Sequence, residues 1–328
     1  MIQHLSRLLV VVLLLAGCVA RLAPPGPAVQ PAGETEDAFI MPDGTALPYR
    51  VWLPTGPVQT VMLALHGMND SRDAWEYSAP EFAAAGIAVF SPDQRGFGAT
   101  PTRGLWPGTG GLVDDTRVIV QLLRARYPGL PLFLMGESMG GAAMIVLATG
   151  PDAPKVDGYV LVAPAVWSRD EMNVFMRSSL WLADQIVPGM QLTGGGIVKV
   201  TASDNHAALV RLSTDPLTIH GTRVDAIEGL VDLMDQAAAA GPAFRARALF
   251  LYGGHDELVP ARANAALWRA LPRDNVVQAF YPSSYHLMLR DKDRAAPIGD
   301  ILSWMQAPTE PLPSGADKAA AAWLAGQR

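Results

Sequence analysis

A serine lies between two glycines at the point where an apolar segment meets a run of small residues. The stretch reads LFLMGESMGG and holds Ser138 between Gly136 and Gly140. A buried strand that turns directly into a helix has room only for glycine beside the turn, and such a turn exposes the side chain at its apex. A serine hydroxyl becomes a nucleophile at neutral pH when a base, itself oriented by a carboxylate, lies beside it. The sequence therefore predicts nucleophilic chemistry at Ser138, provided that the chain supplies a histidine and an acid.

An acid and a histidine follow two later apolar segments. Asp256 stands in FLYGGHDELVP, and His286 stands in FYPSSYHLML. In a doubly wound sheet the loops at the carboxyl ends of the strands converge on one edge, so both side chains can meet Ser138 there. Glu257 is the alternative acid, and the alternative bases are His206, His220 and His255. The Gly-x-x-Asp pattern favours Asp256 over its neighbour, and the choice of histidine stays open at this point.

Two backbone amides are candidates for the oxyanion hole that acyl transfer requires. The N–H of Met139 is one, because it opens the helix after the nucleophile and adds the helix dipole. The second is the N–H of Met68 in the stretch LALHGMND, where His66 and Gly67 turn the chain. We interpret His66 as a structural residue of this turn rather than as a base.

The elements that must position these residues follow an alternating pattern. Short apolar segments rich in Val, Leu, Phe and Tyr alternate with segments of helical period, which predicts βαβ units and a mainly parallel sheet. The expected strands cover residues 46–54, 60–67, 86–93, 131–136, 158–164, 248–254 and 276–282. The expected helices cover residues 75–85, 112–126, 139–149, 261–271 and 293–304. The stretch from about 167 to 240 shows no clean strand and is expected to form a helical lid over the carboxyl edge of the sheet.

Five blocks, in matching order over about residues 40–305, resemble the monoacylglycerol lipase and lysophospholipase group of α/β hydrolases. They are HGMND, PDQRGFGAT, GESMGG, GGHDELVP and YHLML. The resemblance implies an α/β-hydrolase fold, with a mainly parallel central sheet, helices on both faces and an inserted helical lid. Carried over by position, the resemblance implies that Ser138 is the nucleophile and that His286 is the general base, which then acts as acid. It also implies that Asp256 orients His286 and that the Met68 and Met139 amides bind the oxyanion.

Two departures from the pattern of this group bear on the site. The group commonly has histidine where this chain has Glu137, which changes the surroundings of the turn and leaves the three side chains intact. The segment expected to form the lid, at about residues 167–240, is poorly similar to the corresponding segment of this group. The resemblance therefore defines the chemistry better than it defines the substrate.

Composition and charge exclude several other kinds of protein. The chain has 328 residues, a formal net charge of −6 and a pI near 5.5, so it lacks the basic surface that nucleic-acid binding needs. Its six histidines include no pair at i and i+4 beside a glutamate, which removes support for a zinc-hydrolase site. A single cysteine excludes an intrachain disulfide and a cysteine zinc site. We therefore expect neither a metal nor an organic cofactor.

The single cysteine, Cys18, ends an apolar N-terminal segment. Arg7 and the amino group precede LLVVVLLLAG, which is too short to span a membrane with ordinary flanks and is typical of a signal peptide. The ending Leu-Ala-Gly-Cys resembles the lipobox of bacterial lipoproteins, which implies removal of residues 1–17 and lipidation of Cys18. The same resemblance implies a protein anchored to a membrane of the bacterial cell envelope, and Val19 after the cysteine favours the outer membrane.

The rest of the chain divides into a spacer, a body and a tail. Residues 18–33 are rich in Pro, Gly and Ala and are expected to be an extended tether with no fold. Residues 34–306 are expected to form the hydrolase domain, with the lid at about 167–240. Residues 307–328 begin with a Pro-rich break and are expected to be a flexible tail.

These features together predict a membrane-tethered serine hydrolase that cleaves carboxylic esters with an apolar acyl chain through an acyl-enzyme. Monoacylglycerols and lysophospholipids are the substrates that the resemblance implies. Two alternatives stay open. One is a peptidase or amidase of the same fold, which would need an acidic pocket for a free amine. The other is a lipoprotein that uses the fold as a non-catalytic interaction module.

Overall fold

The computed structural model describes residues 20–193 and 200–327. Cys18 and the signal peptide expected over residues 1–17 lie outside the described residues. Within the described part of the chain, no helix is both long enough and apolar enough to cross a membrane.

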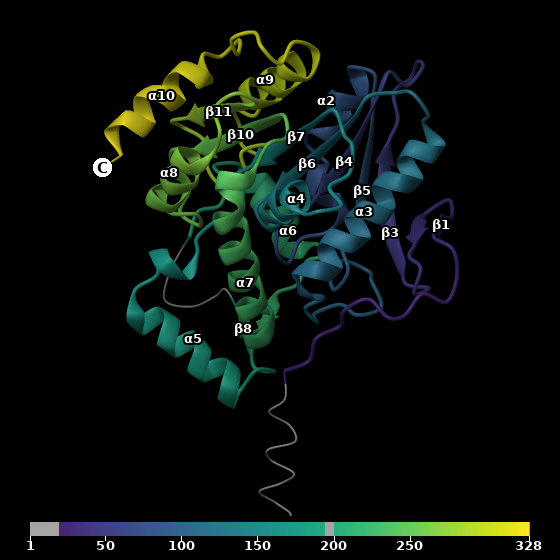
Figure 1. Cartoon of the computed structure of the whole chain (residues 1–328), viewed down its shortest axis with the longest axis vertical. Helices are drawn as coiled ribbons and strands as arrows, with labels where there is room; N and C mark the ends of the chain where they lie inside the picture. The colour runs from purple at the N-terminus through teal and green to yellow at the C-terminus, as the bar shows by residue number, and fades with distance from the viewer. Residues whose placement is uncertain (1–19, 194–199, 328) are drawn as a thin grey trace, which may run out of the picture.

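A sheet of nine strands forms the centre of the protein (Figure 1). Its spatial order is β1-β2-β3-β5-β4-β6-β7-β10-β11, and the strands from β5 to β11 in this order run parallel. The strands are β1 (Gly33–Glu34), β2 (Ala38–Ile40), β3 (Ala46–Trp52), β4 (Thr60–Leu65), β5 (Ile87–Pro92), β6 (Leu132–Glu137), β7 (Gly158–Val162), β10 (Ala248–Gly253) and β11 (Val276–Tyr281). β5, β6, β7 and β10 are buried along their whole length, as expected for parallel strands covered on both faces.

Helices cover both faces of the sheet, and successive side chains of a strand point to opposite faces. Val61, Leu63 and Leu65 of β4 belong to the core cluster under α3, α4, α7 and α8. Met62 and Ala64 of the same strand belong to the second cluster, under α2 and α9. The helices are α2 (Ala79–Ala84), α3 (Gly108–Arg126), α4 (Met139–Thr149), α7 (Val224–Ala240), α8 (Ala261–Ala270) and α9 (Ala295–Gln306).

The parallel strands bring the candidate residues to one edge of the sheet. Met68 follows β4, Ser138 follows β6, Asp256 follows β10 and His286 follows β11. Because these strands run parallel, their carboxyl ends lie on the same side. Every strand and helix expected from the sequence is present, with ends shifted by a few residues, and the α/β class is confirmed.

The segment between β7 and β10 differs from the lid expected over residues 167–240. α7 belongs to the body, because its buried side chains, among them Leu233 and Ala237, pack in the larger core cluster against α4. A parallel crossover needs a helix that covers the sheet, and α7 supplies it. The insertion proper is therefore shorter. It contains α5 (Val174–Ile186), α6 (His206–Thr214), the short helix η2 (Arg169–Glu171) and an antiparallel pair missed from the sequence, β8 (Gln191–Thr193) with β9 (Gly221–Arg223).

The C-terminal segment is packed, in contrast to the flexible tail expected over residues 307–328. α10 (Ala316–Gly326) covers the edge strand β11 (Figure 1). The Trp323 ring stacks on Phe280 with 5.0 Å between centroids and meets Trp268 edge-on at 5.2 Å. Aromatic contacts of this kind bury large apolar areas. The tail is thus held by tertiary packing that its Ala-rich composition does not reveal.

The spacer expected over residues 18–33 is also bound to the body where the structure describes it. The Arg21 N–H donates to Asp225 Oδ2 at 3.0 Å. The Gly26 N–H donates to Asp43 Oδ2 at 2.9 Å. An extended Pro-rich backbone makes no internal hydrogen bonds, so its N–H groups are free to bond elsewhere. The prediction of a tether with no fold is therefore corrected: the described part of this segment lies along the domain.

Candidate active site

Ser138 occupies the tight turn between β6 and α4. Its φ of 53° and ψ of −114° are strained for a residue with a side chain, as in the strand-to-helix turns that expose a nucleophile. A Cβ on Gly136 would lie 2.6 Å from the Gly140 backbone, and a Cβ on Gly140 would lie 2.3 Å from the Leu65 carbonyl oxygen. The close approach of β6, α4 and β4 therefore requires a glycine on each side of the serine.

His286 and Asp256 form a buried pair beyond the ends of β11 and β10. His286 Nδ1 lies 2.8 Å from Asp256 Oδ2, and both side chains are almost inaccessible to solvent. The other carboxylate oxygen, Oδ1, accepts the N–H groups of Leu258 at 2.8 Å and Val259 at 2.9 Å. These bonds fix the carboxylate. Because an ionised carboxylate only accepts hydrogen bonds, Nδ1 carries the proton and Nε2 keeps a lone pair.

The surroundings raise the pKa of His286 above its ordinary value of 6.5. Burial alone lowers this pKa, but the negative charge of Asp256 and its hydrogen bond to the ring outweigh the effect of burial. A base that takes a proton from serine must be neutral, and a higher pKa makes it a stronger base. The pair thus has the properties of a general base held by its carboxylate.

Glu257, the alternative to Asp256, does not point at the histidine. Its side chain is exposed, and Oε2 accepts the Thr201 N–H at 2.7 Å. The geometry therefore selects Asp256 as the partner of His286.

Among the histidines that the structure describes, His286 is the one that shares a cavity with Ser138. The alternatives that do not line this cavity are His206, His220 and His255. The structure thus brings Ser138, Asp256 and His286 to one site. Their catalytic roles stay a prediction.

The Met68 and Met139 amides lie beside the serine. Met139 is the first residue of α4, where a helix leaves its N–H without an intrahelical partner. A Cβ on Gly67 would lie 3.3 Å from Ser138 Cβ, so the peptide unit that follows Gly67, which carries the Met68 N–H, is close to Ser138. Over residues 20–193 and 200–327, neither amide donates to a backbone carbonyl. Both therefore stay available to bind an oxyanion.

His66 holds the Met68 loop in place. Its Nε2 accepts the Gln94 N–H at 3.1 Å, and its Nδ1 donates to the Gly67 carbonyl at 2.8 Å. The ring is fully buried, and burial lowers its pKa, which keeps it neutral. These contacts agree with the interpretation of His66 as a structural residue.

Sequence reasoning missed a buried arginine that links three loops of the site. Arg290, four residues after His286, donates to Asp70 in the Met68 loop and to Glu137 beside Ser138, the latter at 3.3 Å. All three side chains are buried. Burial raises the pKa of Glu137, and the positive charge of Arg290 opposes this rise. A signal was present, because a charged residue in place of the usual histidine at position 137 requires a partner once it is buried.

An Arg290→Met protein is expected to lose about 3–5 kcal/mol of its free energy of unfolding, because two carboxylates would lose their counter-charge inside the protein. Urea unfolding at pH 7 measures this loss. The matched control is Arg50→Met, since Arg50 pairs with Asp73 but its side chain is 43% exposed, and exposed pairs contribute at most about 1 kcal/mol. Equal, small losses in both proteins would show that the buried carboxylates do not depend on Arg290.

Ser138 and His286 open into a cavity of about 560 Å³ between the body and the insertion. Its lining is predominantly apolar and includes Trp167, Met172, Met176, Leu180, Leu230 and Met234. The carboxylates that line it within the described residues are Asp70 and Glu137, and Arg290 contacts both. The cavity therefore offers an apolar environment with no free negative charge.

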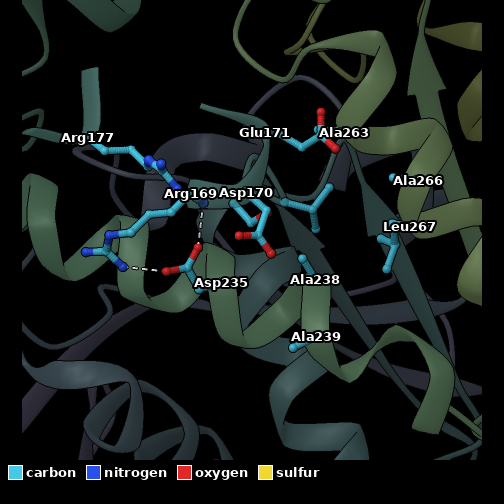
Figure 2. A pocket seen from close by; sticks show the side chains of 12 residues that line it. Arg169, Asp170, Glu171, Arg177, Asp235, Ala238, Ala239, Ala263, Ala266 and Leu267 are labelled. Carbon is cyan, nitrogen blue, oxygen red and sulfur yellow. Dashed lines mark hydrogen bonds and ion pairs between the residues drawn. The ribbon is translucent and has the colours of Figure 1, made fainter. Parts of the chain in front are cut away.

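A second hollow of about 660 Å³, shown in Figure 2, has a charged lining and lies where the insertion leaves the body. The Arg169 N–H donates to Asp235 Oδ1 at 2.6 Å, and its guanidinium contacts Asp235, Glu228 and, at 2.8 Å, Asp232. These charges satisfy one another and tie η2 to α7. We interpret this hollow as the joint that fixes the start of the insertion, not as a second active site.

No group of three or more His, Cys, Asp or Glu residues with the geometry of a metal site occurs in the ranges that the structure describes. Ser138 shares a cavity with a histidine that is held by a carboxylate, and two backbone N–H groups lie beside the serine. Acyl transfer needs no further group.

Comparison with known proteins gives a family match and several relatives. The family described as serine aminopeptidase S33 matches residues 56–293. The monoacylglycerol lipase of Mycolicibacterium smegmatis is 27% identical over 277 residues, covering 83% of this chain and 96% of that protein. Human monoglyceride lipase is 26% identical over 263 residues, covering 77% of this chain and 84% of that protein.

A solved structure has the same fold. The soluble variant of Saccharomyces cerevisiae monoglyceride lipase, in complex with a substrate analog, superposes with a TM-score of 0.70 at 19% identity. The superposition covers 88% of this chain and 99% of that one. The central sheet with helices on both faces is therefore the α/β-hydrolase fold that the sequence motifs predict.

Proposed function

The chain belongs to the serine aminopeptidase S33 family of α/β hydrolases, and we propose that it is a serine hydrolase that cleaves lipid esters with an apolar acyl chain. The observation that carries this proposal is the apolar cavity onto which Ser138 and His286 open. Such cavities bind the apolar part of a ligand and leave a few polar groups to orient the reacting atoms. Relatives named as monoacylglycerol and monoglyceride lipases support the same class of substrate.

The proposed mechanism has two symmetrical halves. Ser138 Oγ attacks the ester carbonyl carbon while His286 Nε2, oriented by Asp256, takes the hydroxyl proton. The carbonyl oxygen becomes an oxyanion, which the Met68 and Met139 N–H groups bind. His286 then returns the proton to the departing alcohol, the C–O bond breaks, and the acyl group stays on the serine. Water attacks this acyl-enzyme in the same way and releases the fatty acid.

The cavity suits an ester better than a peptide with a free amino terminus. A buried ammonium group needs a carboxylate that is free to pair with it. In the described residues, both carboxylates of the cavity already contact Arg290. A monoacylglycerol or a lysophospholipid places its acyl chain against apolar side chains and needs no such partner.

We also propose that the mature protein is a lipoprotein of the bacterial cell envelope, anchored through Cys18 after removal of residues 1–17. The support is the Leu-Ala-Gly-Cys ending of the apolar leader, and Val19 favours the outer membrane. One acyl chain binds a membrane weakly, whereas two or more hold a protein stably. An anchored enzyme would meet long-chain esters where they reside.

The full chain is expected to release fatty acid from a long-chain monoacylglycerol with a kcat/KM at least roughly 10²-fold above that for an aminoacyl arylamide, because the cavity has no free carboxylate for the amine. Fatty-acid release from a monoacylglycerol and from lysophosphatidylcholine, measured in parallel with arylamide cleavage, tests this. Ser138→Ala is the control for contaminating lipases.

Three other outcomes would each change the conclusion. Faster cleavage of the arylamide would favour a peptidase. Labelling of Ser138 by a fluorophosphonate, without cleavage of either lipid, would keep a serine hydrolase and reject the lipid substrate. Absence of labelling would favour a non-catalytic interaction module.

A further inference from the structure

We propose that the N-terminal strap and the outer face of α5 orient the protein on the bilayer that carries its own lipid anchor, so that the cavity takes its substrate from that bilayer. The N-terminal strap is residues 21–30. The outer face of α5 consists of Val174, Phe175, Trp181, Leu182 and Ile186. This inference rests on the proposed function and on lipidation of Cys18, and it adds which surface meets the membrane.

α5 presents apolar side chains on two sides. Met176 and Leu180, one turn apart, line the cavity. The side chains of the outer face are each at least 50% exposed, and Phe175 reaches 78%. Figure 1 shows α5 at the edge of the molecule, away from the sheet, and the body helix that it contacts is α7. Soluble proteins expose apolar residues singly, whereas a contiguous group of large ones marks a surface that meets a partner or a lipid.

The N-terminal strap begins at the end of this apolar helix. The Arg21 N–H donates to Asp225 Oδ2 at 3.0 Å, and the Asp225 N–H donates to the Pro188 carbonyl, also at 3.0 Å. Pro188 is the second residue after α5, and the exposed Met190 follows it. In Figure 1 the purple start of the described chain reaches the body beside β8, at the end of the molecule where α5 lies.

The N-terminal strap does not behave as a loose linker. Further bonds along it join Ala23 N–H to the Trp106 carbonyl at 2.8 Å, Gly26 N–H to Asp43 Oδ2 at 2.9 Å, and Val29 N–H to the Pro42 carbonyl at 2.8 Å. Between Cys18 and Arg21 the chain has only Val19 and Ala20, which span at most about 10 Å. A lipid on Cys18 would therefore enter the bilayer within about 10 Å of Arg21, which hydrogen bonds link through Asp225 to the chain just after α5.

A bilayer explains this surface through apolar insertion rather than through charge. α5 carries one basic and one acidic residue, Arg177 and Asp184, and the chain has a net charge of −6. Attraction to anionic headgroups is therefore weak, and the outer face of α5 gains by placing its apolar side chains at the level of the acyl chains. Trp181 has the amphipathic ring that membrane–water interfaces favour. With the other side of α5 lining the cavity, an ester could pass from the bilayer to Ser138 without crossing water.

A unique thiol gives a direct test with the full lipidated chain. Lipidation consumes the thiol of the sole cysteine, so Phe175→Cys offers one site for an environment-sensitive fluorophore. In phosphatidylcholine vesicles we expect a blue shift of its emission and quenching by brominated acyl chains. Lys318→Cys, exposed on α10 at the opposite end of the molecule, is the matched control and should show neither effect. The Ser138→Ala background should give the same result, since this readout does not depend on catalysis.

Activity gives a second readout. Phe175 and Trp181 lie outside the cavity lining, so Phe175→Asp with Trp181→Asp should leave turnover of a soluble short-chain ester unchanged. Hydrolysis of a monoacylglycerol in the enzyme's own vesicles should fall at least roughly tenfold, because a charged face no longer enters the lipid. If that hydrolysis stays unchanged, the cavity does not draw on the bilayer through this face.

Each remaining outcome of the labelling overturns a defined part of the inference. Equal, unshifted emission from Phe175→Cys and Lys318→Cys would reject contact of α5 with the bilayer. A blue shift at Phe175→Cys that rises with protein concentration in the absence of vesicles would assign the face to a second copy of the chain. Labelling of the wild-type protein would show that Cys18 is free and would remove the anchor. Failure of lipid hydrolysis alone would reject the proposed function and leave the orientation standing.

Discussion

A Ser138→Ala protein is expected to fold like the wild type and to lose about 10⁶-fold in kcat for ester hydrolysis, as other serine triads do when the nucleophile is removed. Removal of Oγ leaves no atom that His286 can activate. The Met68 and Met139 amides would stay in place and support only a residual rate, roughly 10³- to 10⁴-fold above that in water. Turnover of a soluble short-chain ester measures the loss, and thermal unfolding checks the fold.

Ser91→Ala is the matched control for this substitution. Ser91 lies in β5, is fully buried, and its hydroxyl has no hydrogen-bond partner in the described structure. Ser91→Ala thus deletes a serine Oγ as well, but inside the core and away from the cavity. Turnover of the short-chain ester should therefore stay at the wild-type level. Retention of more than roughly 10⁻³ of the activity in Ser138→Ala would mean that another residue acts as nucleophile.

The sheet and the candidate triad could be predicted because both depend on local signals. A strand that is buried on both faces must consist of a short run of apolar residues. The segment that forms β6 is such a run. The turn at Ser138 needs glycines for steric reasons, so it leaves a mark in the sequence. The carboxyl ends of parallel strands meet at one edge, which makes the separation of Ser138, Asp256 and His286 along the chain unimportant.

The features that escaped prediction depend on contacts between distant parts of the chain. Glu137 is separated by 153 positions from Arg290. A buried glutamate requires a partner, but nothing near either residue identifies Arg290 as that partner. Trp323 stands in an Ala-rich segment that reads as loose until β11 presents Phe280 to it. The N-terminal strap has the composition of a spacer, and only the acceptors that the body offers, such as Asp225, bind it.

The extent of the insertion between β7 and β10 also could not be predicted from local sequence. α7 has the period of any amphipathic helix, so its sequence does not distinguish a helix that covers a sheet from one in a lid. The crossover rule supplies the missing information, because β7 and β10 are parallel neighbours that require a helix between them. The strands β8 and β9 are three residues each, too short to show a pattern.

Asp256→Asn is expected to lower kcat by about 10⁴-fold, because an amide in place of the carboxylate holds the imidazole in the wrong tautomer. Asp256 Oδ1 accepts two backbone N–H groups. The asparagine oxygen would keep that position, and its NH₂ group would face His286 Nδ1. The imidazole proton would then move to Nε2, which could no longer take the proton of Ser138.

The pH profile separates this effect from a general loss of structure. The charge of Asp256 is the main influence that raises the pKa of His286, so Asp256→Asn lowers that pKa. Activity requires the neutral ring and is lost as the pH falls through this pKa, so the acid limb of the residual activity should move to lower pH. Glu257→Gln is the control, since its exposed carboxylate binds Thr201 instead; neither kcat nor the acid limb should change. Removal of the carboxylate that sets the pKa of His286 must shift the acid limb of the pH profile. Loss of activity in Glu257→Gln, together with an unmoved acid limb in Asp256→Asn, would therefore assign the orienting role to Glu257.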